Sequence, residues 1–460
     1  MKVYLFLILL FCSGLCLSQK KKIIRKADFP TEFRMISDDI LSKGKAYEQL
    51  RELTKKIGPR FSGSSNLTKA EDWAVQKLKE SGATQVWKQA VPVKVWNRGK
   101  ESLEIKIGNN SWKKINMTAL GGSEGTAGQD LVGEILLVKN IEEFNKLNFA
   151  DIKDKIIFFN VPFDQKIVNP VETYLEVGKY RWAIPANVSR RGAKAIITRS
   201  LTSAFDDVPH TGSMSYDTDD NNKIPALAIG AKSADELEEA LKNKQKIIAK
   251  LNTTSTFGET KTNFNIIGEI PGNKDNNIIV VAAHLDSWDI SEGAHDNGAG
   301  VVHCLEVLRA FKNLDIQNNH TIRVVLFTNE ENGVTGGEVY AQQVKKKEEK
   351  HLFAIESDAG GFSPRGISLD MIPERRRQVF EWKSYFLPYG VYDFDQTYSG
   401  QDIQPLKKLD IPLAELVPDT QRYFDIHHTS EDTFDKVNRR ELLLGAVTMA
   451  QIVYIIDKNW

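Results

Sequence analysis

The sequence predicts an α/β fold: a mostly parallel mixed sheet flanked by helices, with a β-rich segment inserted into it. In the C-terminal half, short apolar runs alternate with amphipathic helical patterns. Residues 277–283 are almost continuously apolar, as expected of a strand buried on both faces. Strands joined by helices favour parallel pairing. From about residue 121 to residue 251 the pattern changes to short β-rich runs with one or two helices, which indicates an insertion.

The elements of the main fold follow from periodicity and from helix-end signals. Before the insertion we expect helices over 38–56 and 70–81 and a strand over 85–96. Thr68 to Glu71 has the spacing of a capping box, which would begin the second helix. After the insertion we expect strands over 277–283, 321–328, 352–357 and 411–417, and helices over 298–314, 336–350 and 439–457. The main fold is therefore divided between 38–120 and 252–460, on either side of the insertion at 121–251.

The composition and the charge balance exclude wholesale disorder and argue against a nucleic-acid-binding protein. The 460 residues include 61 basic and 61 acidic side chains, so the net charge is zero, and 41% of the residues are hydrophobic. Such a chain can bury a large core, which excludes wholesale disorder. A nucleic acid is not expected as the main partner, because phosphate binding requires an excess of basic residues.

Residues 1–18 have the pattern of a secretory signal. Lys2 precedes an apolar run from Val3 to Cys12, and small and polar residues follow near Ser18. A membrane anchor is the competing interpretation, but the run is shorter than the ~20 apolar residues that a span requires. We therefore expect a secreted protein without stable membrane insertion; the sequence does not distinguish secretion from retention in the lysosome. Residues 19–37 begin with basic residues and form either a short propeptide, as in a zymogen, or a solvated tail.

Cysteines and glycosylation motifs agree with secretion. Two of the three cysteines lie in the signal, so only Cys304 is left in the mature chain, as a buried thiol without a disulfide partner. N-glycans are expected at several of the six N-x-S/T motifs, which begin at Asn66, Asn109, Asn116, Asn187, Asn252 and Asn319.

Residues that bind metals follow the predicted strands at the point where each strand ends. His284 and Asp286 close the first strand, the Glu330-Glu331 pair follows the second, and Asp358 follows the third. Two loops add Asp296 and His428, the residues that complete the set. In open α/β sheets, ligands bind beyond the carboxyl ends of the strands. These side chains are therefore expected to converge on one edge of the sheet.

These residue types suit a hydrolytic centre with two metals. Such a centre needs neutral imidazoles and carboxylates, one carboxylate shared between metals roughly 3.5–4 Å apart, and one carboxylate left to accept a proton from water. The donors suit zinc, although cobalt or manganese would also fit. A lone histidine or glutamate pair at a strand end is more often structural, but joint occurrence at consecutive strand ends favours a metal centre. His295 and His427 are assigned only local shape or substrate contacts.

These segments resemble the di-zinc exopeptidase family that includes the zinc aminopeptidases. The resemblance covers nearly the whole mature chain, and the insertion resembles a protease-associated domain. The segments that carry it are His284–Asp289, Gly293–Gly300, Glu330–Gly333, Ser357–Gly361 and Tyr423–Thr429.

The resemblance implies a role for each residue of the site. It implies that two Zn²⁺ bind per chain, one held by His284 and Asp358 and the other by Glu331 and His428. Asp296 would bridge the two ions and precede a cis peptide bond to Asn297. Glu330 would be the general base and later the acid, and Asp286 would orient His284.

The resemblance implies a secreted zinc exopeptidase that hydrolyses short peptides, with free dipeptides as the expected substrates of this carboxypeptidase or dipeptidase. One alternative is a zinc aminopeptidase on longer peptides, because the same centre serves both. Another is a non-catalytic secreted binding protein of the same fold, although a structural metal site has no need of the spare carboxylate Glu330. A serine hydrolase is a weak third. The resemblance also implies a homodimer.

Overall fold

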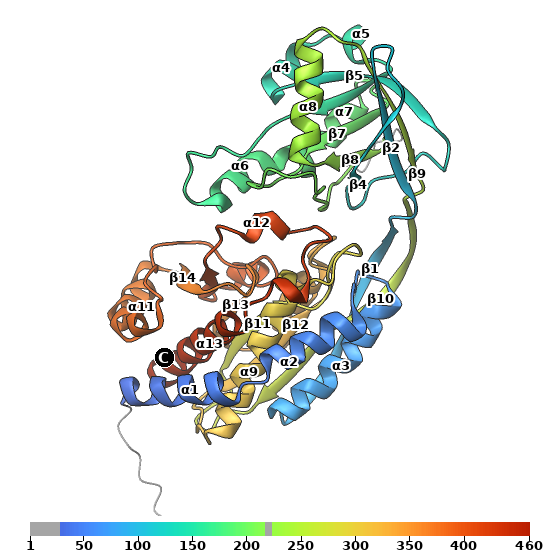
Figure 1. Cartoon of the computed structure of the whole chain (residues 1–460). Helices are drawn as coiled ribbons and strands as arrows, with labels where there is room; N and C mark the ends of the chain where they lie inside the picture. Colours follow the sequence, from blue (N-terminus) through green and yellow to red (C-terminus); the bar gives the residue numbers. More distant parts are fainter. Residues whose placement is uncertain (1–27, 217–222) are drawn as a thin grey trace, which may run out of the picture.

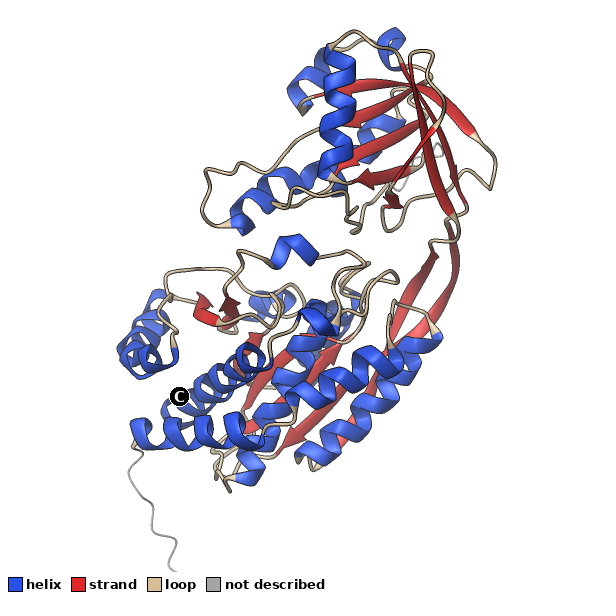
Figure 2. Cartoon of the chain, in the orientation of Figure 1, coloured by secondary structure: helices blue, strands red, loops and turns tan. Residues whose placement is uncertain are grey.

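The computed structural model describes residues 28–216 and 223–460, apart from the side chains of residues 184–186. The described residues form two parts, each built on its own sheet (Figures 1 and 2). The predicted signal at 1–18, and residues 19–27 after it, lie outside the described residues. No helix in the described ranges combines the length and the apolar character needed to cross a membrane.

The main sheet is mixed, as predicted. Its four central strands β12, β11, β13 and β15 are parallel, whereas β1, β10 and β14 pair antiparallel at its edges. In sheet order the strands are β1 (Gln85–Asn97), β10 (Thr256–Ile270), β12 (Thr321–Phe327), β11 (Ile278–His284), β13 (His351–Glu356), β15 (Leu413–Pro418) and β14 (Pro364–Asp370). Every residue of β11 and β12 is buried, which explains why β11 is apolar up to His284 and why β12 is apolar apart from Thr321 and Arg323.

Helices cover both faces of this sheet. The larger core lies between one face and α1 (Phe29–Lys43), α2 (Ala46–Arg51), α3 (Ser65–Ser81), α9 (Ala299–Asn313) and α13 (Arg439–Asn459). A smaller core lies under α10 (Thr335–Lys347) and the 3₁₀ helix Gln404–Leu409 on the other face. Two further helices lie outside these layers. Helix α11 (Pro373–Phe386) lies on the side of β14, and α12 (Tyr423–Ile426) lies between the main sheet and the inserted part (Figure 1).

The second sheet belongs to the inserted part. Its order is β3 (Lys113–Ile115), β2 (Glu101–Ile107), β9 (Ile247–Thr253), β5 (Leu131–Val138), β6 (Lys155–Phe159), β7 (Ala195–Arg199), β8 (Ala226–Ile229) and β4 (Met117–Ala119). The helices of this part are α4 (Ile141–Lys146), α5 (Phe149–Ile152), α6 (Pro170–Trp182), α7 (Ile184–Ser189) and α8 (Ala231–Lys242). The long strands β1 and β10 lead into it, and α6 faces α12 of the main part (Figure 1).

Two predicted boundaries and one predicted helix content differ from the structure. The second sheet begins at Glu101, not near residue 121, because β2 already pairs with β9. The insertion also holds more helices than the one or two expected. The predicted tail at 19–37 overlaps α1, whose Phe33 and Ile36 are buried in the main core, so residues 29–37 belong to the fold.

Two helix predictions also need correction. The helix expected over 38–56 is broken at Gly44, whose backbone is not helical (φ −57°, ψ 143°), and a side chain there would collide with the main-chain oxygen of Ile40 and with Leu443. The second helix begins before Thr68, because the hydroxyl of Ser64 accepts a hydrogen bond from Leu67 N and caps the helix there.

Candidate metal centre

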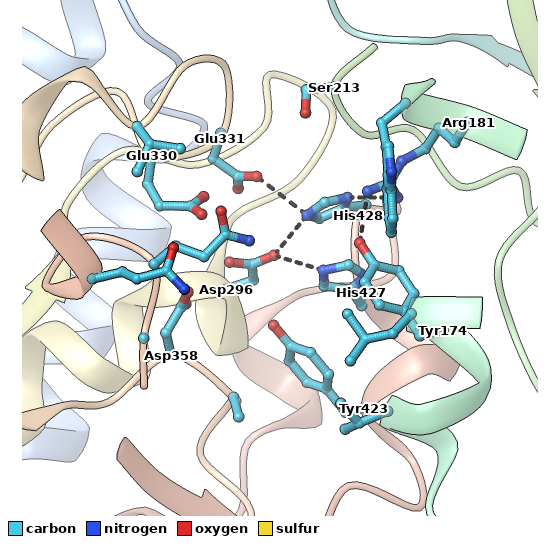
Figure 3. Close-up of a pocket in the computed structure, with 18 of the residues that line it drawn as sticks. Tyr174, Arg181, Ser213, Asp296, Glu330, Glu331, Asp358, Tyr423, His427 and His428 are labelled. Atoms are coloured by element: carbon cyan, nitrogen blue, oxygen red, sulfur yellow. Dashed lines mark hydrogen bonds and ion pairs between the residues drawn. The ribbon is translucent and has the colours of Figure 1, made fainter. Parts of the chain in front are cut away.

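The predicted donors converge where three neighbouring parallel strands end. His284 is the last residue of β11, Glu330 and Glu331 follow β12, and Asp358 follows β13. The loop after α12 brings His428 to the same edge of the sheet, opposite Glu331 (Figure 3). The carboxyl ends of parallel strands share one edge, so the strand order itself gathers these residues.

Asp296 lies between two sets of donors. Its Oδ1 is 3.1 Å from His284 Nε2, and its Oδ2 is 3.2 Å from His428 Nε2. His284 Nε2 is also 3.0 Å from Asp358 Oδ1, and His428 Nε2 is 3.2 Å from Glu331 Oε2. The arrangement therefore consists of two imidazole–carboxylate sets that share one carboxylate.

The side chains fit divalent cations. Burial raises the pKa of both Glu330 and Glu331 well above the usual carboxyl range, and neighbouring carboxylates reinforce the shift. Glu331 Oε1 is buried without a hydrogen-bond partner among the described residues. Closely spaced, buried carboxylates with an unpartnered oxygen favour a bound cation. The mixture of imidazole and carboxylate donors suits zinc.

The loop that carries Asp296 is held in place by hydrogen bonds between side chains and main-chain groups. The peptide bond from Asp296 to Asn297 is cis, as predicted. Asp432 accepts hydrogen bonds from the main-chain nitrogens of His295 and Asp296, at 2.7 and 3.0 Å. The Asn297 amide donates to Ser357 O at 2.8 Å, which ties this loop to the end of β13.

Glu330 belongs to neither of the two imidazole–carboxylate sets. Its Oε2 lies 4.0 Å from His284 Nε2, its side chain is 12% exposed, and it lines the cleft described below. Asp286 differs from its predicted role. The main-chain oxygen of Asp286 bonds to His284 Nδ1 at 3.1 Å, whereas its carboxylate lies 3.8 Å from that nitrogen and instead accepts from Glu330 N at 3.2 Å. The Asp286 carboxylate therefore positions the backbone of Glu330 more directly than the ring of His284.

The inserted part holds the His428 loop from above, which the sequence did not indicate. His428 has a left-handed backbone with φ of 62°. Its main-chain oxygen accepts from Thr211 N at 2.9 Å, and the oxygen of His427 accepts from His210 Nδ1 at 2.8 Å. No motif surrounds His210 or Thr211 in the sequence, so only the structure reveals these contacts.

The two histidines assigned local or substrate contacts occupy different surroundings. The His295 ring stacks on Phe362, and its Nδ1 accepts from Gly361 N at 3.1 Å, a structural arrangement. His427 stacks on His428 with ring centres 3.5 Å apart, and its Nε2 is 3.6 Å from Asp296 Oδ2. His427 thus borders the metal centre, where substrate contact stays a prediction.

A cleft of about 680 Å³ opens over the donors between the two parts. The main part contributes Asp296, Glu330, Glu331, Asp358, His427, His428, Tyr423 and the loop at 398–401, and the inserted part contributes Val171, Tyr174, Leu175, Arg181, Trp182 and residues 213–215. Figure 3 shows the acidic residues on one side of this cleft and the histidines, Tyr174 and Arg181 on the other.

A serine nucleophile finds no support in the structure. Residues 121–125 have the G-x-S-x-G spacing of a nucleophile elbow. However, Ser123 is buried, and its hydroxyl accepts from Ala226 N and donates to the main-chain oxygen of Glu124. These bonds join the hydroxyl to main-chain groups, so the motif has a structural role here.

Comparison with known proteins identifies the family. Residues 265–453 match the model of Peptidase family M28. The protein is also 30% identical to Carboxypeptidase Q of Homo sapiens over 98% of each chain. The chain belongs to peptidase family M28. This confirms the predicted resemblance to the family and to carboxypeptidase Q.

Two further relatives extend over both parts of the chain. Aminopeptidase YwaD of Bacillus subtilis (strain 168) is 27% identical over 89% of this chain and 84% of its own. The crystal structure of the Peptidase M28 precursor from Shewanella amazonensis SB2B has a TM-score of 0.88 and 31% identity. It covers 93% of this chain, and 96% of its own chain is matched, so this M28 member has a counterpart of the inserted part as well as of the main sheet.

Proposed function

We propose that this M28 member is a zinc-dependent exopeptidase that hydrolyses short peptides, with free dipeptides as its substrates. The observation that carries the proposal is Asp296, whose two oxygens face His284 and His428 while Glu330 is left outside both sets. A structural metal site would not need this additional carboxylate. The similarity to carboxypeptidase Q supports a carboxypeptidase or dipeptidase.

The chain would hold two zinc ions. In this proposal His284 and Asp358 hold one ion, Glu331 and His428 hold the other, and Asp296 is shared. When bound, the ions would lower the pKa of a water molecule and polarise the scissile carbonyl. Glu330 takes the proton of the attacking water and then donates it to the leaving amine. Asp286, through Glu330 N, keeps this carboxylate at the edge of the donor sets.

The roof over the cleft supports short substrates. This roof consists of α6 and residues 213–215 of the inserted part. A peptide bound at the donors is therefore covered by a helix and a loop of the inserted part. One observation favours the alternative, an aminopeptidase on longer peptides. A second hollow of about 610 Å³ shares Val171, Tyr398 and Thr420 with the first and would accommodate further residues. Similarity to Aminopeptidase YwaD points the same way.

Secretion, glycosylation and a homodimer remain part of the proposal. The surroundings of the six glycosylation motifs differ. Asn109, Asn116 and Asn187 are exposed. By contrast, the amides of Asn66, Asn252 and Asn319 donate to main-chain oxygens. We therefore expect glycans at the three exposed asparagines, which peptide mass mapping of the secreted protein would reveal.

The substrate class is tested with one dipeptide in three forms: free, N-acetylated and C-amidated. The zinc-loaded mature protein should hydrolyse the free form alone, and a chelator should abolish the reaction. Equal hydrolysis of the C-amidated form would favour the aminopeptidase. If no form is cleaved while zinc is bound, the exopeptidase proposal fails and the binding protein becomes the better account.

A further inference from the structure

Arg181, at the end of α6, is a buried cation that has no anionic partner in the part of the chain that the structure describes. Only 5% of the residue is exposed. Its Nη1 donates to Thr211 O at 3.3 Å, its Nη2 donates to the Tyr174 hydroxyl at 2.6 Å, and its Nε has no hydrogen-bond partner within residues 28–216 and 223–460. None of the described carboxylates forms an ion pair with it. A buried charge is costly unless it is paired, so this guanidinium lacks a partner that buried cations usually have.

Other buried arginines of the chain are better satisfied. Arg98, at 7% exposure, forms two hydrogen bonds to the carboxylate of Asp289 at 2.7 and 2.8 Å. Arg60 is fully buried and donates to three main-chain oxygens, those of Leu285, Glu292 and Gly293. Arg181 has one main-chain oxygen and one hydroxyl, which leaves part of its five N–H donors available to a ligand.

The ring of His428 borders Arg181. Its Nη1 is 3.5 Å from His428 Nδ1. The other ring nitrogen of His428 faces Asp296 and Glu331, so in a metal-binding ring Nδ1 carries the hydrogen. Two N–H donors then face each other and share one main-chain acceptor, Thr211 O, which leaves Arg181 without an anion beside it among the described residues. A Cβ at Gly212 would lie 2.3 Å from the guanidinium carbon, so the glycine leaves room for this arrangement.

We propose that Arg181 binds the carboxylate on the substrate residue that follows the scissile bond. Arg181 lines the cleft and is separated from Asp296 and Glu331 by the ring of His428 (Figure 3). A guanidinium matches a carboxylate with two parallel hydrogen bonds. This inference rests on the proposed exopeptidase function and adds to it. In this inference the inserted part recognises the carboxyl end of the peptide. That contact distinguishes a carboxypeptidase or dipeptidase from an aminopeptidase.

The carboxylate could come from the C-terminus or from an acidic side chain. Three substrates separate these sources: Ala-Ala, Ala-Ala-amide and Ala-Glu-amide. Arg181→Gln should raise KM for Ala-Ala by about 10- to 100-fold, the range for a lost hydrogen bond to a charged group, with less effect on kcat. Ala-Ala-amide, which the wild type should cleave little or not at all, should be cleaved no more slowly by the variant, and Arg181→Lys should restore part of the affinity for Ala-Ala. A matching loss on Ala-Glu-amide would assign the site to a side-chain carboxylate as well.

A structural role for Arg181 predicts a different result. If Arg181→Gln lowers kcat/KM equally for Ala-Ala and its amide, Arg181 acts through His428 and the inference is wrong. Calorimetric binding of alanine and alaninamide to the zinc-loaded wild type and variant adds a test that needs no turnover. The inference requires that the variant lose the preference for alanine, and an unchanged preference overturns it. No cleavage of any peptide by the wild type would instead defeat the proposed function.

Discussion

The main sheet and the inserted sheet contribute to the cleft in different ways. The main sheet supplies every predicted donor, each placed directly after a buried strand or in a loop beside it. The inserted sheet supplies no predicted donor, yet Thr211 and His210 hold the loop of His428, and Arg181 faces that histidine. In the proposed function, the chemistry therefore resides in the main sheet, whereas the shape and the substrate selectivity of the site depend on the inserted sheet.

The largest expected effect is on the main sheet, through the shared carboxylate. Asp296→Ala should lower kcat on the order of 10³-fold or more, because several kcal/mol of charge stabilisation are lost, and it should lower zinc content. Asp425→Asn is the matched control, since Asp425 lies near His428 in sequence but bonds to Ser203. Steady-state kinetics and metal analysis check both. Activity within tenfold of wild type for Asp296→Ala would contradict the assignment.

A second prediction concerns acid stability of the main part. His303 is buried between Ser357 Oγ and Leu442 O, and burial lowers its pKa to about 4. The unfolded chain binds this proton near pH 6.5, so the contribution of His303 is present above that pH and is lost as the pH falls toward about 4. The loss should reach about 3 kcal/mol, on the basis of ~1.4 kcal/mol per pH unit.

Denaturant unfolding of the metal-free protein between pH 7 and pH 4 tests this contribution. In His303→Gln the unfolding free energy should fall less steeply as the pH decreases, because one proton fewer is taken up on unfolding. This change in slope is expected whatever the effect of the substitution on stability at pH 7. An identical pH slope in the variant would show that His303 does not remain neutral in the fold.

A third prediction concerns the link between the two parts. Arg98, just after β1, pairs with Asp289 of the main part through two hydrogen bonds. Asp289→Asn should lower the unfolding free energy by about 2 kcal/mol, because it leaves a buried guanidinium poorly paired. The exposed pair of Lys113 and Glu236 is the control, and Glu236→Gln should cost less than about 0.5 kcal/mol. Equal effects of the two substitutions would mean that the Arg98–Asp289 pair stabilises the fold no more than an exposed ion pair does.

The smallest effect should come from the support that the inserted part gives to His428. His210→Leu removes the hydrogen bond to His427 O while it preserves the apolar volume. Zinc affinity should fall by roughly 10-fold, at the low end of the range for groups that orient metal ligands. Competition with a chromogenic chelator measures this change. Unchanged affinity would show that the main sheet holds the His428 loop without help.

The sequence predicted the main sheet better than the inserted part, for physical reasons. The strands β11, β12 and β13 are buried on both faces, so their apolar runs and the polar residues that end them stand out. Polar and apolar residues alternate along β2, but this alternation does not indicate which sheet the strand joins. The predicted start of the insertion at residue 121 was therefore wrong. Contacts such as Thr211 N to His428 O join main-chain atoms distant in sequence, and no side-chain pattern encodes them.

The role of Asp286 illustrates the same limit within the main part. Two-residue spacing correctly placed Asp286 beside His284 at the end of β11. Which atom of Asp286 meets the ring depends on the turn after the strand, and there the main-chain oxygen takes that position. The carboxylate is left to bond Glu330 N.

The most direct test of the central claim is to measure zinc content and dipeptide turnover together in Glu330→Gln. The account predicts that this variant binds zinc like the wild type but loses at least about 100-fold in kcat, the effect of removing a general base. The neighbouring Glu331→Gln is the control and should lose zinc as well as activity. If Glu330→Gln binds zinc normally and turns over within tenfold of the wild type, Glu330 is not the base and the proposed mechanism is wrong.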